Sequence, residues 1–344
     1  MTDLKLLEKL CRASGISGDE SSVRNIILSE IKDYATNVKT DALGNLIVFK
    51  AGKEKPKSKL MISAHMDEVG FIVNHITDSG FLKFSTVGGI DKKVIPGKSV
   101  TVGKNKIPGV IGVKPIHLLK PDEKQDVIPI DDMYIDIGAK NKKDAEKHVN
   151  LSDSVCFDSI FDIDGKIIKA KALDDRVGCF ILINLIKNDL PFDTYFTFVV
   201  QEEIGLRGAT TAAFSVDPDC ALVIEATTAG DTSCNESKNP VCKVNGGAVI
   251  SFMDGHTVYD KEYYHLAFNV AAENNIKVQA KEATTGGNDA GAIHVSRGGV
   301  RTLAISLPCR YLHSATGLIS LNDLDAVQNL TAKLAATILA TGSK

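Results

Sequence analysis

Two ionisable side chains follow an apolar run near residue 60. The segment "LMISAHMDEVGFIV", residues 60–73, places His65 and Asp67 directly after residues 60–64, which have the composition of a strand buried on both faces. A His-x-Asp triplet is expected by chance in a chain of 344 residues, and a structural histidine explains this position equally well. Their position after this strand makes His65 and Asp67 candidates for a binding site, because ligands bind at the carboxyl ends of strands in open α/β sheets.

Other apolar runs end in the same kinds of side chain. An acidic helix cap explains the pair in "KALDDRVGC" as well as a binding site does. A cap explains the pair in "FTFVVQEEIGLRG" less well, because two acids at a buried strand end repel each other unless a cation is present. Four strand ends of this kind favour a site, and the residues are Asp174, Asp175, Glu202, Glu203, Glu225 in "CALVIEATTAGD" and His313 in "LAISLPCRYLHSATG".

Two histidines with several carboxylates, and no thiolates, are the ligand set typical of zinc, cobalt or manganese in a hydrolytic centre with two metals. Such a centre needs one carboxylate between the two cations, terminal ligands on each, and one acid free of metal to accept a proton. Adjacent glutamates at a strand end point in different directions. One of them can therefore bind metal while the other acts as the base.

The elements that must position these residues alternate along the chain. Helices and strands follow each other up to residue 69 and again from residue 166, which predicts a mixed-sheet α/β/α catalytic domain formed by residues 1–69 and 166–344. Residues 70–165 consist of short β-rich runs between Gly, Pro and Lys turns. We expect this segment to form an inserted small β-barrel-like domain. The segment "SGDE", residues 17–20, predicts a cap for the helix that follows it.

Composition excludes several classes of partner. The 40 basic and 43 acidic residues are interleaved, with no basic stripe, so we expect neither nucleic acid nor a membrane as a partner. Seven scattered cysteines without a Cys-x-x-Cys motif argue against a disulfide framework and a thiolate zinc site, and favour reduced, buried thiols. No signal peptide or long apolar segment is recognisable, which predicts a cytoplasmic protein.

Six motifs carry a resemblance to a known family. The segments "SAHMDEVG", "LDDRVG", "QEEIGLRGA", "IEATTAGD", "GGNDAGAIH" and "PCRYLHS" resemble, in order and spacing, the dinuclear metallo-aminopeptidases that include the tetrahedral, deblocking and glutamyl aminopeptidases. The resemblance implies one metal on His65, Asp174 and Glu225, and a second metal on Asp174, Glu203 and His313. It also implies that Asp174 bridges the two metals, that Asp67 orients His65, and that Glu202 is the general base. Many relatives have Asp where this chain has Glu225.

The resemblance implies a metal-dependent aminopeptidase that hydrolyses amino-terminal residues from short peptides with two divalent ions, zinc or cobalt. It further implies that residues 70–165 mediate self-association to a dimer or dodecamer. Two alternatives are an endoglucanase-type glycoside hydrolase, which the absence of Trp disfavours, and a catalytically silent assembly protein, which would lack the base that Glu202 provides.

Other polar residues have simpler explanations. Gly286 and Gly287 predict a tight loop near the site, and Asp289 a helix cap or a contact on the substrate side. The remaining histidines are expected to be ordinary surface or core residues, with His117 the least certain; they are His75, His117, His148, His256, His265 and His294.

Overall fold

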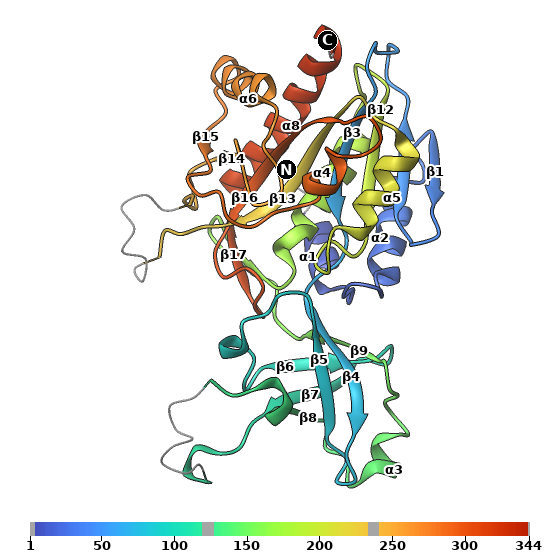
Figure 1. The fold of residues 1–344 in the computed structure, drawn as a ribbon, viewed down its shortest axis with the longest axis vertical. Coiled ribbons are helices and arrows are strands. Elements are labelled where there is room, and N and C mark those ends of the chain that lie inside the picture. The colour runs from blue at the N-terminus through green and yellow to red at the C-terminus, as the bar shows by residue number, and fades with distance from the viewer. Residues whose placement is uncertain (1–3, 119–126, 233–240, 343–344) are drawn as a thin grey trace.

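An eight-stranded mixed sheet forms the centre of the larger body (Figure 1). The computed structural model describes residues 4–118, 127–232 and 241–342. The strand order is β1-β2-β12-β3-β13-β16-β14-β15. The strands are β1 (Asn37–Thr40), β2 (Leu46–Lys50), β3 (Leu60–His65), β12 (Thr194–Val199), β13 (Cys220–Thr228), β14 (Ala248–Ile250), β15 (Val278–Ala280) and β16 (Arg301–Cys309).

Parallel strands in the middle of this sheet bring the predicted strand ends to one edge. β3 pairs in parallel with β12 and β13, and β13 pairs in parallel with β16. Val199 lies opposite His65 and Glu225 lies opposite Ser306. β3 is buried along its whole length, as its apolar composition predicts. The carboxyl ends of these strands therefore meet at one edge of the sheet.

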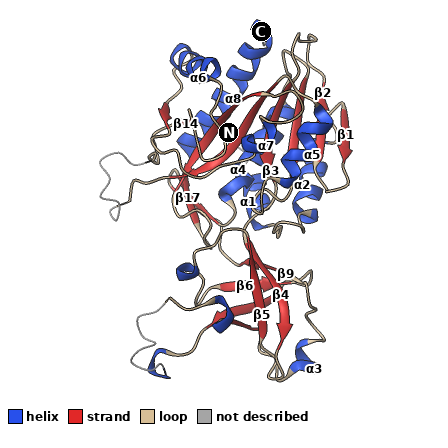
Figure 2. Cartoon of the chain, in the orientation of Figure 1, coloured by secondary structure: helices blue, strands red, loops and turns tan. Residues whose placement is uncertain are grey.

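Helices cover both faces of the sheet, so the predicted α/β/α layering is confirmed (Figure 2). α4 contacts β3 and β13, α8 contacts β14 and β16, and these two helices also contact each other. α5 and α7 form a second set: they contact each other, and both contact strands of the sheet. A single apolar cluster joins these layers. The helices are α1 (Leu4–Arg12), α2 (Ser21–Ile31), α4 (Leu173–Lys187), α5 (Arg207–Val216), α6 (Lys261–Glu273), α7 (Ala290–Ile293) and α8 (Leu321–Thr341).

A closed β-barrel follows the carboxyl end of β3 in the chain and forms a second body (Figure 1). It has its own apolar core, in which the ring of Phe71 contacts those of Phe84 and Phe157 edge to face. The predicted barrel-like insert is thus a true barrel, in the order β4-β5-β8-β7-β6-β9. Its strands are β4 (Gly70–Ile76), β5 (Leu82–Val87), β6 (Ser99–Val102), β7 (Ile107–Gly112), β8 (Tyr134–Asp136) and β9 (Ser154–Phe157), with the short helix α3 (Lys142–Ala145) beside them.

Three short strands lie between the barrel and the large sheet. β10 (Asp162–Asp164) and β11 (Ile167–Ala170) pair with each other, and β11 pairs with β17 (Gly317–Ser320). β11 leads directly into α4 and β17 into α8. The domain boundaries at residues 70 and 165 stay predictions.

The thiols agree with the reduced state expected from the sequence. All six cysteines in the described residues are free and buried, and Cys234 lies outside those residues. Among the described helices, none combines the length and the apolarity needed to cross a membrane.

The cap predicted for residues 17–20 is wrong. α2 begins after Glu20, whose side chain makes no capping hydrogen bond. Glu20 instead accepts hydrogen bonds from the backbone amides of Gly18, at 2.6 Å, and Gln201, at 3.3 Å. A local pattern suggested the cap, but the Gln201 contact comes from a segment far away in the sequence.

Candidate metal centre

His65 ends β3 and faces two carboxylates. Its Nε2 atom lies 3.2 Å from Asp174 Oδ1 and 3.4 Å from Glu225 Oε1. Its Nδ1 atom lies 3.1 Å from the backbone oxygen of Asp67 and 3.5 Å from that residue's Oδ1. The imidazole is buried, so contacts on both sides fix the orientation of the ring.

The adjacent aspartates at the start of α4 have different tasks. Asp175 accepts hydrogen bonds from the amides of Gly178, at 3.0 Å, and His65, at 3.3 Å, and so performs the helix-capping role considered for the pair. A Cβ at Gly178 would lie 2.3 Å from the Asp175 carboxylate, which explains the glycine there. Asp174 turns instead to the histidines, with Oδ1 toward His65 and Oδ2 3.5 Å from Nε2 of His313.

Glu202 and Glu203 lie in the turn after β12, and Asp67 fixes that turn. The Asp67 carboxylate accepts hydrogen bonds from the backbone amides of Glu202, at 3.0 Å, and Glu203, at 3.1 Å. It also accepts one from the hydroxyl of Ser17 at 2.6 Å. Asp67 thus connects the end of β3, the turn after β12 and the segment before α2.

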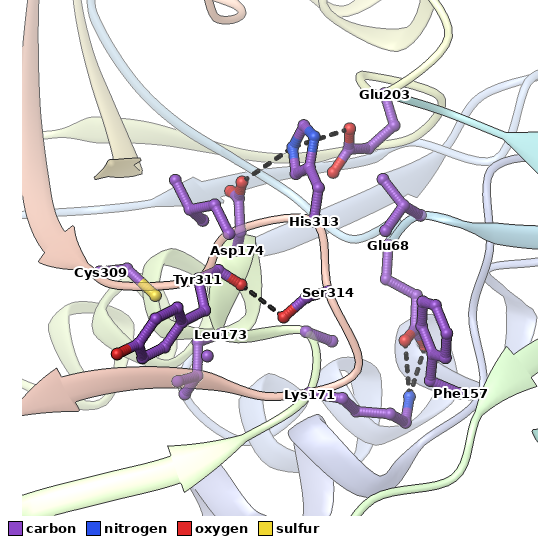
Figure 3. Close-up of a pocket in the computed structure, with 14 residues that line it drawn as sticks. Glu68, Phe157, Lys171, Leu173, Asp174, Glu203, Cys309, Tyr311, His313 and Ser314 are labelled. Carbon is purple, nitrogen blue, oxygen red and sulfur yellow. Dashed lines mark hydrogen bonds and ion pairs between the residues drawn. The ribbon is translucent and has the colours of Figure 1, made fainter. Parts of the chain in front are cut away.

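His313 lies in the loop between β16 and β17, between two carboxylates (Figure 3). Its Nε2 atom is 3.3 Å from Glu203 Oε2, and its side chain is 39% exposed. The backbone of His313 has a φ of 55°, and Ala172, Gln201 and Tyr311 share this left-handed conformation. Each lies within two positions of a predicted ligand, and such conformations cost about 1–3 kcal/mol and concentrate at functional sites.

The predicted ligands form two groups that share Asp174. The ligand atoms within each group lie within 4.8 Å of one another: His65, Asp174 and Glu225 in one, and Asp174, Glu203 and His313 in the other. His65, Glu202 and Glu203 form a third such group. All five predicted ligands and Glu202 line one cleft of about 330 Å³, a size typical of small-molecule sites. A second, smaller cavity shares Asp174, Glu203 and His313 with this cleft, and Figure 3 shows the residues that line it.

Burial of so many acids shifts their proton affinities. Burial raises the pKa of Glu202 to about 7 and that of Glu203 to about 8, with Asp174 adding to both shifts. Burial opposes the charge on Asp174, but hydrogen bonds with His313 and His65 hold its pKa well below the ordinary value. The hydrogen bond with Asp174 raises the pKa of His313 to about 9. The cluster therefore stabilises positive charge.

This donor set fits divalent cations. Imidazole nitrogens and carboxylate oxygens are the ligands that zinc, cobalt and manganese accept, and two triads sharing one carboxylate can hold two ions. A cation between buried carboxylates would also remove the repulsion that raises their pKa values. None of the other histidines belongs to a comparable ligand group within the described part of the chain.

Two buried charged residues near the site, Asp289 and Lys281, differ from what the sequence indicates. Asp289 is completely buried and, although it precedes α7, makes no capping hydrogen bond, so the cap alternative is wrong. Both of its carboxylate oxygens lack a hydrogen-bond partner. Lys281 also lines the cleft, although no sequence motif pointed to it. Its only sequence signal is a position shortly before the glycine loop at residues 286–287, which does not show where a lysine points.

An α/β/α sheet whose strand ends collect imidazoles and carboxylates in a cleft defines a metal-dependent hydrolase. The family model of the M42 glutamyl aminopeptidases matches residues 44–330. The chain belongs to this family of metal-dependent peptidases.

Relatives along the whole chain agree. A protein of Acetivibrio thermocellus is 41% identical over 93% of this chain and 94% of its own length. A lysyl aminopeptidase of Pyrococcus furiosus is 31% identical over 98% of this chain and 97% of its own. A glutamyl aminopeptidase of Lactococcus lactis is 30% identical over 92% and 91%.

Solved structures share the fold. A TET aminopeptidase from a Thaumarchaeota archaeon has a TM-score of 0.92 and 35% identity, covering 96% of this chain and 95% of its own. The TET1 peptidase of Pyrococcus horikoshii, described as assembling into a tetrahedron or an octahedral shell, has a TM-score of 0.85 and 37% identity, with coverages of 96% and 98%. A Thermotoga maritima structure described as an endoglucanase has a TM-score of 0.82 and 35% identity, with coverages of 98% and 99%.

Proposed function

We propose that the chain is a dinuclear metallo-aminopeptidase that removes single residues from the amino ends of short peptides in the cytoplasm. The observation that carries this proposal is the pair of ligand triads that share Asp174, whose two oxygens face different histidines. His65 and Glu225 would complete one site, and Glu203 and His313 the other. Zinc or cobalt fits these nitrogen and oxygen donors.

Two divalent ions bound there would polarise the scissile carbonyl and lower the pKa of a water molecule. Glu202 lines the same cleft without belonging to either triad that contains Asp174. It would accept the proton of the attacking water and return it to the leaving amine. Asp67 would keep His65 and the turn carrying Glu202 in place through the contacts described above. Glu225 adds one methylene relative to the aspartate of many relatives, without a change of charge.

A glycoside hydrolase is the second candidate, because one structural relative is described as an endoglucanase. Paired carboxylates also cleave glycosidic bonds. The chain has no tryptophan, the side chain that most often stacks on sugar rings, and glycoside hydrolysis would give the two histidines no task. An assembly protein without activity would need no base at the position of Glu202. The proposed peptidase reaction gives a role to all five candidate ligands and to Glu202.

The test combines metal removal with a substrate panel. A chelator should abolish release of the terminal residue from unblocked dipeptides and aminoacyl anilides. Added zinc or cobalt should restore it, because the protein provides the ligands of the triads but not the ions. Amino-acetylated peptides and soluble cellulose derivatives should stay intact. Activity that persists in fully metal-free protein, or release of reducing sugar, would contradict the proposal.

A further inference from the structure

Among the described residues of the cleft, one cationic side chain lies away from the ligand triads. Lys281 follows β15 and is the only lysine or arginine among the described residues that line the cleft. It is 8% exposed, although lysine is rarely so buried. The other described side chains that line the cleft, beyond the triads and Glu202, are neutral.

Lys281 lacks a carboxylate partner. Its Nζ atom donates a hydrogen bond to the backbone oxygen of Thr285 at 3.1 Å. No carboxylate in the described part of the chain lies within ion-pair distance of it. An ammonium group has three hydrogens to donate, so a single carbonyl leaves most of this capacity unused. A buried charge without a counterion is costly, which favours an anionic group as the ligand of Lys281.

We propose that Lys281 selects substrates whose amino-terminal residue has an acidic side chain. The inference rests on the proposed function: when the scissile carbonyl and the free amine lie at the triads, the side chain of the residue to be released must occupy the rest of the cleft. A glutamyl or aspartyl carboxylate would pair with the ammonium group of Lys281 there. A lysyl side chain would meet a like charge.

Family membership does not decide this preference. The relatives include both a lysyl and a glutamyl aminopeptidase, at nearly equal identities of 31% and 30%. Membership of the family is therefore compatible with a preference for acidic or for basic residues. Among the described residues of this chain, Lys281 is the charged side chain of the cleft that lies outside the ligand triads and the proposed base.

Two other roles for Lys281 make different predictions. If the lysine only holds the loop through the Thr285 carbonyl, its loss should reduce turnover of every substrate alike. If it only compensates the charge of the acidic cluster, its loss should change metal content. A role in selection changes the ratio between substrates and leaves metal content constant.

The experiment compares wild-type protein with Lys281→Met and Lys281→Glu on glutamyl, leucyl and lysyl anilides, after zinc or cobalt loading and measurement of metal content. Lys277→Met is the matched control, because Lys277 is exposed, lies four residues away and does not line the cleft. The wild type should prefer the glutamyl substrate. Lys281→Met should lower kcat/KM for it about 10- to 100-fold, as expected for one hydrogen bond to a charged group. Leucyl turnover should stay within about threefold, and Lys281→Glu should favour the lysyl substrate.

Calorimetry of L-glutamate and L-leucine binding supplies a readout independent of turnover, and only glutamate binding should weaken in Lys281→Met. A wild-type preference for leucyl or lysyl substrates, an equal loss on all substrates, or loss of metal in Lys281→Met would each overturn the inference. Leucyl turnover would still support the proposed function in those cases. Failure of the metal-loaded wild type on every anilide would overturn the proposed function itself.

Discussion

At the scale of single residues, the contacts of Asp67 fix the backbone of the two adjacent glutamates without involving their side chains. Asp67 holds the amides of Glu202 and Glu203 with its two oxygens, so the turn is fixed without either glutamate side chain. Glu203 can then face His313, and Glu202 can face the cleft. The two side chains should therefore be separable by mutation.

We expect Glu202→Gln to lower kcat by about a hundredfold to ten-thousandfold, the usual contribution of a general base, with metal content near that of the wild type. Glu203→Ala should lower metal content as well, because it removes a ligand. Activity assays and elemental analysis of the same preparations measure both effects. A Glu202→Gln enzyme within threefold of the wild type would refute the base assignment.

Asp231 and Arg310 provide a prediction on acid stability. Arg310 donates two hydrogen bonds to Asp231, at 2.7 and 2.8 Å, and these hold the pKa of Asp231 below its ordinary value of 3.8. A folded-state pKa below the unfolded one contributes stability that is fully present above the unfolded value and is lost as the pH falls through the folded value. Asp231→Asn should therefore destabilise the protein at neutral pH but not in strong acid.

Urea unfolding of metal-stripped protein at several pH values measures this difference. The gap in the free energy of unfolding between wild type and Asp231→Asn should shrink as the pH falls below 3.8. Asp33→Asn, which removes an exposed carboxylate, is the control and should show little change. A gap independent of pH would mean that the ion pair does not contribute.

At the scale of elements, three buried charges tie the end of β3 to α1 and to the start of α4. Glu68 accepts hydrogen bonds from Lys171 Nζ, at 2.6 and 2.7 Å (Figure 3). It also accepts one from Arg176 Nη2, at 3.1 Å. Arg176 also donates to the backbone oxygens of Met66, Leu10 and Ala13, at 2.8, 2.5 and 3.1 Å. These contacts fix the two segments that carry His65 and Asp174.

Removal of Glu68 alone should be more damaging than removal of the pair. Glu68→Gln leaves two buried cations without their counterion, and we expect a loss of about 3–5 kcal/mol in the free energy of unfolding. The double variant Glu68→Gln/Lys171→Met should recover part of this loss, because one unpaired charge disappears. Urea unfolding of both single variants and the double variant tests the coupling. A double variant as unstable as the sum of the singles would contradict it.

The elements were predictable because strand ends can be read locally. Apolar runs followed by His65 and Glu202 predict where β3 and β12 stop, whereas β13 continues beyond Glu225 to Thr228. The parallel sheet then brings these three residues to the same edge. The sequence could not show that Asp174 faces the histidines while Asp175 accepts backbone hydrogen bonds, because either residue could act as a helix cap or as part of a site. The burial of Lys281 beside the cleft and the reach of Glu20 to Gln201 depend on contacts between distant segments, which composition and spacing do not encode.

At the scale of the whole molecule, residues 70–165 carry exposed large apolar side chains, among them one between α3 and β9 and one between β9 and β10. Leu151 is 58% exposed and Ile160 67% exposed. Exposed apolar side chains are candidates for contacts with another protein surface. We propose that this surface mediates self-association to a dimer or dodecamer.

Light scattering should show an oligomer for the wild type and smaller species for Leu151→Asp and Ile160→Asp, because a buried, unpaired carboxylate opposes association. Val258→Asp changes a residue that is 74% exposed on the sheet body, and it should leave the size unchanged. A wild type that is monomeric at micromolar concentration would remove this proposal.

Contacts of the first helices set a limit on how far the chain can be shortened. The family match covers residues 44–330, yet Ser17 donates to Asp67, and the carbonyls of Leu10 and Ala13 accept from Arg176. At the other end, α8 runs to Thr341 with Ile338 buried. A recombinant fragment trimmed to residues 44–330 would lose the amino-terminal partners of Asp67 and Arg176 and the last turns of a core helix. The smallest autonomous unit is therefore longer than the segment by which the family is recognised.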